Sequence, residues 1–284
     1  MKTYSISQLE YKANEIRQDI IKLLLEAGSG HTAGPLGMTD IFTALYFRVL
    51  KHNPKNPRWK DRDRLILSNG HIVPVKYAAM AHAGYFPKSL LKTFRKINSK
   101  LEGHPSFKKL PAMETSSGPL GEGLSQASGF ALAARMDKAK YRVWCLTSDG
   151  EHQEGMTWEA AMLAAKYRLT NLTQIIDRNN IQIDGVTEDI MPLEPLRKKY
   201  EAFGWHVIEM NPHDMEEVVS TLEGVKGIQE KPVCIIANTI PGKGVSFMEN
   251  DYKWHGVPPD KDQAKAALKE LRQLKTKSDL GSKR

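Results

Sequence analysis

Residues 143–185 read VWCLTSDGEHQEGMTWEAAMLAAKYRLTNLTQIIDRNNIQIDG. The stretch opens with the apolar run Val143–Thr147, which breaks at a Ser-Asp-Gly turn (residues 148–150), and it ends soon after a second apolar run, Leu172–Asp177. Between the two runs, apolar residues recur at spacings of three and four, which is typical of a helix with one apolar face: Met156, Ala160, Leu163, Ala164 and Tyr167. The order strand, turn, helix, strand predicts a βαβ unit whose two strands are parallel.

Polar groups follow both predicted strands at the point where each strand ends. Asp149 follows the first strand, and Asn179 follows the second. Because parallel strands finish at the same edge of a sheet, the two side chains can converge there. A carboxylate, an amide oxygen and a free backbone carbonyl suit a hard cation such as magnesium, which also keeps bonds to phosphate oxygens. Either turn alone is most simply a turn without a ligand, but the pair on consecutive strands favours a bound metal and phosphate.

The rest of the chain continues the alternation of helix and strand. This order indicates a doubly wound, mainly parallel α/β sheet flanked by helices. We predict a single domain over residues 1–284, with a flexible tail from about residue 276. Further helices are expected at residues 6–27, 41–50, 75–83, 88–97, 193–203 and 215–222 and from about residue 260, and further strands at 64–67, 205–208 and 233–237.

The composition is that of an ordinary globular chain. Apolar residues make up 40% of the sequence, and no apolar run approaches the ~20 residues of a membrane span. The N-terminus leads directly into a polar amphipathic helix, so we expect no secretory signal. The two cysteines, Cys145 and Cys234, fall in predicted buried strands and are interpreted as small core residues of a reducing compartment. We therefore expect a cytoplasmic protein that does not bind membranes.

The net charge of +8 is mildly basic, but lysine and arginine are scattered along the chain. Nucleic-acid binding would require a basic stripe, a reading motif or an aromatic platform, so no nucleic-acid partner is expected. A general attraction for phosphorylated metabolites or for an acidic partner fits this charge better.

Four histidines lie in loops beside glycine or proline: His31, His71, His104 and His255. A single loop histidine is most simply a surface residue. Four in such loops suggest a site, since histidine can hold a diphosphate or a sugar hydroxyl and can move a proton near neutral pH. Their spacing does not fit zinc ligands. A further glycine-rich loop, residues 118–123, opens a helix whose unpaired N–H groups could approach a ligand.

Taken together, these motifs resemble those of transketolases. The two turns after the strands resemble the Gly-Asp-Gly and Asn-Asn signature of thiamine-diphosphate enzymes, although Ser148 replaces the usual first glycine. The resemblance covers about residues 8 to 260. It rests on an ordered set of motifs: Gly28-Ser29-Gly30-His31, Ser68-Asn69-Gly70-His71, Gly103-His104-Pro105, Gly118-Pro119-Leu120-Gly121-Glu122-Gly123, Asp149 with Asn179, and His255-Gly256.

The resemblance implies a role for each matching residue. Asp149, Asn179 and the carbonyl of Ile181 would bind the divalent metal, which would be magnesium or alternatively calcium or manganese. His31, His104 and His255 would line the substrate channel as catalytic residues. The residues that would contact thiamine diphosphate are His71, Gly118, Pro119, Leu120, Asp149, Gly150, Asn179 and His255. Glu154 would be a structural or inter-subunit carboxylate, although an acid at a helix start explains it equally well.

The implied reaction is the transfer of a two-carbon ketol unit from a ketose phosphate to an aldose phosphate, as in the pentose phosphate pathway. A full transketolase resembles this chain followed by a pyrimidine-binding domain, which carries the glutamate that activates the cofactor through its aminopyrimidine ring. The resemblance therefore implies the N-terminal subunit of a split transketolase. Its partner would be a C-terminal subunit carrying the pyrimidine-binding domain, in a two-fold heterotetramer or a dimer.

Two alternatives remain open. The chain could be half of another thiamine-diphosphate enzyme, of the 2-oxoacid dehydrogenase or deoxyxylulose-phosphate synthase type. It could also be a non-catalytic cofactor-binding subunit. The set of histidines favours ketol transfer over the first, and the intact metal and histidine motifs argue against the second.

Overall fold

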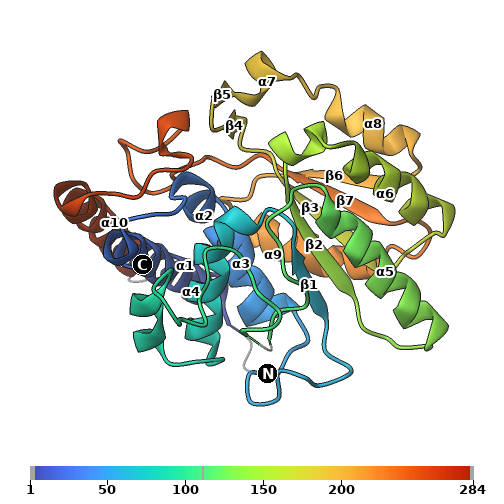
Figure 1. Ribbon diagram of the computed structural model, residues 1–284, viewed down its shortest axis with the longest axis horizontal. Coiled ribbons are helices and arrows are strands. Elements are labelled where there is room, and N and C mark those ends of the chain that lie inside the picture. The colour runs from blue at the N-terminus through green and yellow to red at the C-terminus, as the bar shows by residue number, and fades with distance from the viewer. Residues whose placement is uncertain (1–3, 111, 282–284) are drawn as a thin grey trace.

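The computed structural model describes residues 4–110 and 112–281, and the side chains of these residues up to 274. Among them, five strands form one sheet in which every pairing is parallel (Figure 1). The spatial order is β1 (Arg64–Leu67), β2 (Val143–Ser148), β3 (Leu172–Asp177), β7 (Val233–Ala237) and β6 (His206–Met210). This arrangement confirms the predicted fold class.

Helices cover both faces of the sheet, and alternate strand residues point to each. Leu146 and Ile175 pack on one side, whereas Cys145 and Ile176 pack on the other. Both cysteines are buried free thiols, as predicted. The first layer contains α1 (Ile6–Ala27), α3 (Thr39–Ala44), α4 (Val73–Ala83), α9 (Met215–Gly224) and α10 (Lys261–Gly281), and the second contains α5 (Glu122–Met136), α6 (Gly155–Lys166) and α8 (Leu196–Ala202).

Some of the short elements lie beyond the carboxyl ends of the strands. The strands β4 (Ile181–Gln182) and β5 (Gly185–Val186) form a small antiparallel pair, and α7 (Thr187–Ile190) follows them at the edge of the molecule (Figure 1). Neither this pair nor α2 (Ala33–Gly37) was expected from the sequence. The other short elements are a π-helical turn at Leu45–Val49 and 3-10 turns at Gly70–Ile72, Lys88–Thr93, Gly150–Gln153, Val225–Gly227 and Tyr252–Trp254.

Several helix predictions were wrong in extent: α4 begins at Val73 rather than at residue 75, and α8 begins at Leu196 rather than at residue 193. The helix expected over residues 88–97 is a 3-10 segment that ends at Thr93, because the backbone turns through left-handed conformations at Arg95 and Asn98 (φ 60° and 63°). The helix expected from residue 41 begins at Thr39, and its last turn is π-helical.

The apolar face expected on α6 was partly wrong. Met156 and Leu163 are exposed, whereas the small residues Ala160, Ala161 and Ala164 form the buried face. These alanines pack with alanines of α5 in the same core, and small side chains allow two helices to approach closely.

The described part of the chain ends in helix α10. Helix α10 runs to Gly281, and the side chains from residue 275 lie outside the described set, so the flexible tail predicted from about residue 276 remains a prediction. The single-domain assignment for residues 1–284 also stays a prediction. No helix within the described residues has the length and apolar character needed to cross a membrane.

Candidate active site

The residues singled out in the sequence converge on one cavity at the carboxyl edge of the sheet. The cavity has a volume of about 440 Å³, within the range of small-molecule sites. Of the eleven residues predicted for the site, ten line it: His31, His71, His104, Gly118, Leu120, Asp149, Gly150, Asn179, Ile181 and His255. Only Pro119 is not among the lining residues, although both of its neighbours are.

Three of the histidines form a cluster within this cavity. The ring centroid of His31 lies 4.8 Å from that of His71 and 5.4 Å from that of His255. Burial lowers the pKa of His31 and of His255 to about 4 and that of His71 well below its usual value. These rings are therefore neutral near pH 7, and each has a ring nitrogen that can accept a hydrogen bond. The buried Nδ1 of His31 has no hydrogen-bond partner among the described residues, so it is available to a ligand.

Arg95, which was not singled out in the sequence, stands beside two histidine loops. A Cβ on Gly103 would lie 2.9 Å from Arg95 Nε, and one on Gly30 would lie 3.7 Å from the same atom. The guanidinium therefore packs against the residues that precede His104 and His31. Burial, followed by the charge of Arg95, lowers the pKa of His104. The same cation adds to the effects of burial and of His255 in lowering the pKa of His31.

Replacing Arg95 by methionine should raise the pKa of His104 and of His31, because a neighbouring positive charge opposes protonation. The ring protons of both histidines, followed by NMR through a pH titration, should then shift at higher pH than in the wild type. Arg95→Lys should stay close to the wild type, and Lys92→Met serves as a control on an exposed neighbouring lysine. Unchanged titration in Arg95→Met would contradict this account of the histidine environment.

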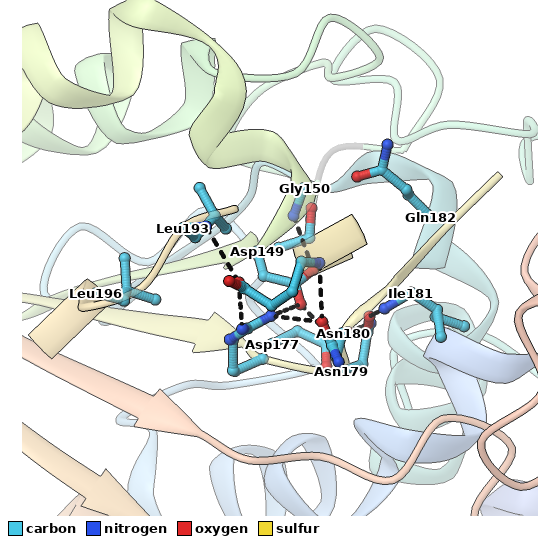
Figure 2. Close-up of polar contacts among 12 residues, drawn as sticks. Asp149, Gly150, Asp177, Asn179, Asn180, Ile181, Gln182, Leu193 and Leu196 are labelled. Carbon is cyan, nitrogen blue, oxygen red and sulfur yellow. Dashed lines mark hydrogen bonds and ion pairs between the residues drawn. The ribbon is translucent and has the colours of Figure 1, made fainter. Parts of the chain in front are cut away.

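The tips of β2 and β3 bring the predicted metal ligands together (Figure 2). Asp149 is fully buried, and its Oδ1 accepts from Gly150 N at 2.7 Å. Its Oδ2 accepts from Asn180 N at 2.6 Å and from Arg178 Nη1 at 2.9 Å. Burial raises the pKa of Asp149, and the hydrogen bond and charge of Arg178 act in the opposite direction.

The amide of Asn179 is oriented by its neighbours. Its Nδ2 donates to Asp177 Oδ2 at 2.9 Å, and its Oδ1 accepts from Ile181 N at 3.0 Å. Asp177 is itself held by the hydroxyl of Thr239, and burial raises the pKa of Asp177 to about 7. With its nitrogen engaged, the amide turns its oxygen away from Asp177, and that oxygen retains a second lone pair. The oxygens of Asp149 and Asn179 thus fit a hard divalent cation, which prefers oxygen ligands.

Glu151 is a structural residue of the site that the sequence did not reveal. Its Oε1 accepts from Gly121 N at 2.7 Å and from the hydroxyl of Ser68, and its Oε2 accepts from Ser148 N at 3.0 Å. It therefore joins the ends of β1 and β2 to the glycine-rich loop. That loop passes so close to β1 that a Cβ on Gly123 would collide with the side chain of Ser68.

Glu151→Ala should reduce the free energy of unfolding by about 3 kcal/mol or more, because three buried donors would lose their acceptor and each unsatisfied group costs about 1–3 kcal/mol. Urea denaturation followed by circular dichroism measures the change. Glu159→Ala is a suitable control, since it removes an acid from the exposed face of α6. A loss below about 1 kcal/mol would show that Glu151 does not organise these loops.

Comparison with known proteins identifies the class. Residues 9–277 match the family described as transketolase, thiamine diphosphate binding domain. The chain belongs to this family, whose named members are transferases. Among solved structures, the transketolase of Campylobacter jejuni superposes with a TM-score of 0.85 at 33% identity, covering 98% of this chain and 48% of that one. The fold is therefore the thiamine-diphosphate-binding α/β fold.

Relatives of comparable length narrow the identification. The chain is 43% identical to a 6-deoxy-6-sulfo-D-fructose transketolase subunit of Clostridium sp. (strain MSTE9), covering 93% of this chain and 96% of that protein. It is also 43% identical to an apulose-4-phosphate transketolase subunit of Actinobacillus succinogenes, with coverage of 96% and 99%. Human transketolase is 36% identical, but the chain spans only 42% of its length.

Proposed function

We propose that this chain is the diphosphate-binding subunit of a split transketolase. With thiamine diphosphate and magnesium, it would transfer a two-carbon ketol unit from a ketose phosphate to an aldose phosphate. The observation that carries this proposal is that Asp149 and Asn179 line the same cavity as four histidines. A site that binds only a metal would not need these histidines. A site that binds only a sugar would not need the oxygen ligands.

In this proposal, one set of cavity residues binds the metal and the diphosphate, and a second set binds the sugar. Asp149, Asn179 and the carbonyl of Ile181 would hold the metal, and His71, Gly150, His255 and the 118–120 loop would hold the rest of the diphosphate end. The chemistry that bound thiamine diphosphate supplies is an electron sink for cleavage of a carbon–carbon bond. Calcium or manganese could replace magnesium, because their preferred ligands are also oxygens.

The histidines would bind the sugar substrate. His31, His104 and His255 would bind its hydroxyls and move protons. Their lowered pKa values leave them neutral near pH 7, so each would keep a ring nitrogen that accepts a hydrogen bond from a hydroxyl. The buried Nδ1 of His31 has no hydrogen-bond partner among the described residues and is available for such a proton transfer.

A partner chain would complete the site. Relatives of the same length are named as subunits, and the pyrimidine-binding domain of the family would come from the second chain. Ile183 lines the cavity, yet 71% of its surface is exposed, as expected for an apolar residue that a cofactor or partner covers. A two-fold heterotetramer or a dimer in the cytoplasm fits this scheme, since the buried free thiols suit a reducing compartment.

Product analysis tests the proposed function against the 2-oxoacid dehydrogenase and deoxyxylulose-phosphate synthase alternatives. The chain would be combined with a C-terminal subunit carrying the pyrimidine-binding domain, thiamine diphosphate and magnesium, and supplied with ketose phosphates or with pyruvate. Sugar sulfonates and apulose 4-phosphate belong in the set, because the relatives are named for such sugars. Ketol transfer among anionic sugars supports the proposal, whereas turnover of pyruvate alone would overturn it.

A further inference from the structure

Arg178 is the centre of a charge network that the proposed function does not use. It follows β3 directly, and only 9% of its side chain is exposed. Its Nη1 donates to Asp149 Oδ2 at 2.9 Å and to Asn180 Oδ1 at 3.2 Å, and its Nη2 donates to Glu188 Oε1 at 2.6 Å. Glu194 Oε1 accepts from Nη2 at 3.3 Å and from Nε at 3.4 Å. One guanidinium thus joins three carboxylates.

The two glutamates extend this network into the backbone beyond β5. Glu188 Oε1 accepts from Leu193 N at 3.1 Å, and Glu194 Oε2 accepts from Leu196 N at 2.8 Å. Asn180 Oδ1 accepts from Glu188 N at 3.3 Å. Through Arg178, the metal-site carboxylate is therefore connected to residues 181–195, which we call the rim segment.

Outside the Arg178 network, the rim segment is anchored by two buried apolar residues, Ile181 and Leu193. Its backbone also accepts from Gln153 Nε2 at Met191 O (3.2 Å) and from Lys199 Nζ at Leu193 O (2.6 Å). Its strands are two residues each, and a lone two-stranded pair of that size is marginal in water. Ile183, Ile190 and Met191 are exposed and contribute little burial. The segment nevertheless supplies Ile181, Gln182, Ile183 and Asp184 to the cavity wall. Its position therefore bears directly on the shape of the site.

The charges explain why an arginine is needed at this position. Without a cation, Asp149, Glu188 and Glu194 would repel one another, and Asp149 would be a buried carboxylate without a counter-ion. A guanidinium offers several donors in one plane, so it can bond all three carboxylates at once. A lysine supplies the charge but not this branched geometry.

We propose that Arg178 is a positioning residue that fixes the carboxylate of Asp149 and the rim segment as one unit. The part of this proposal that concerns the cofactor rests on the proposed function. The part that concerns the rim segment does not, because it follows from contacts present in the chain alone. Outer-shell partners of metal ligands affect affinity in this way in other sites, by about 10- to 100-fold.

The test compares Arg178→Met and Arg178→Lys with a matched control, Arg197→Met. Arg197 also pairs with two glutamates, Glu201 at 2.8 Å and Glu209 at 3.2 Å, but it lies on the exposed surface of α8. Hydrogen–deuterium exchange of the cofactor-free chain, read by mass spectrometry, reports on the rim segment. We expect faster exchange at residues 181–195 in Arg178→Met, an intermediate rate in Arg178→Lys, and wild-type rates in Arg197→Met.

Calorimetry with thiamine diphosphate and excess magnesium reports on Asp149. Affinity should fall about 10- to 100-fold in Arg178→Met, as for other outer-shell changes, and should stay near wild type in Arg197→Met. The double variant Glu188→Gln/Glu194→Gln separates the two parts, because it leaves the pair between Arg178 and Asp149 intact. It should speed exchange of the rim segment with a smaller loss of affinity.

Three results would overturn the proposal. Unchanged exchange at 181–195 in Arg178→Met would show that the network does not hold the rim segment. Exchange that rises equally over β2, β3 and the rim segment would mark a general loss of stability instead. Tighter binding in Arg178→Met would show that Arg178 competes with the metal for Asp149. If the wild-type chain binds no thiamine diphosphate in any assembly, the proposed function fails, and the exchange results alone decide the link to the rim segment.

Discussion

Asp149→Ala should abolish magnesium-dependent binding of thiamine diphosphate. Asp149 is the carboxylate of the proposed metal site, and the other two ligands are neutral oxygens. Changes to outer-shell partners alone cost about 10- to 100-fold in metal affinity, so loss of the charged ligand itself should exceed 100-fold. Calorimetric titration with the cofactor, at fixed magnesium and again without metal, measures the effect.

Two further variants make this result interpretable. Asp149→Asn keeps the size of the side chain but removes the charge, and it should also bind far more weakly. Asp189→Ala removes an exposed carboxylate from the neighbouring α7 and should bind as the wild type does. If Asp149→Ala folds normally and titrates like the wild type, the metal role assigned to Asp149 is wrong.

The second large effect is expected from the partner subunit. The purified chain alone should show almost no ketol transfer, because the group that activates the cofactor would lie on the pyrimidine-binding domain. General acid–base groups contribute about 10²–10⁴-fold, so adding the partner should raise activity at least 100-fold. A coupled assay with a ketose phosphate and an aldose phosphate measures the rise.

The control for this second prediction is a partner whose activating glutamate is replaced by glutamine. That partner should still assemble with the chain, while activity remains near the level of the isolated chain. Full activity from the isolated chain would contradict the split arrangement.

Much of the fold was predictable because buried parallel strands are continuous apolar runs. The runs Leu172–Asp177 and Val233–Ala237 have the bounds of β3 and β7, and the helix expected at residues 6–27 has the bounds of α1. The β4–β5 pair was not predictable, since strands of two residues carry no periodicity. The face of α6 was misjudged because its contact with α5 uses alanines, while larger apolar residues such as Met162 point outward.

Some residues of the candidate site could also be predicted from the sequence, and others could not. Asp149, Asn179 and the four histidines were visible because each follows a strand or lies in a glycine-rich loop. Glu151 and Arg178 were not, because their importance depends on neighbours from distant parts of the chain, such as Ser68 for Glu151. A glutamate at a helix start and an arginine after a strand are ordinary surface features in a sequence. Only the tertiary contacts reveal them as centres of networks, with Glu151 fully buried and the side chain of Arg178 9% exposed.

A crystal structure of the chain with its partner, thiamine diphosphate and magnesium would locate the metal and the diphosphate. We expect the metal on the side-chain oxygens of Asp149 and Asn179 and on the backbone carbonyl of Ile181, with the diphosphate beside it and the aminopyrimidine ring against the partner. A diphosphate bound elsewhere, with the strand tips of β2 and β3 free of metal, would contradict this expectation.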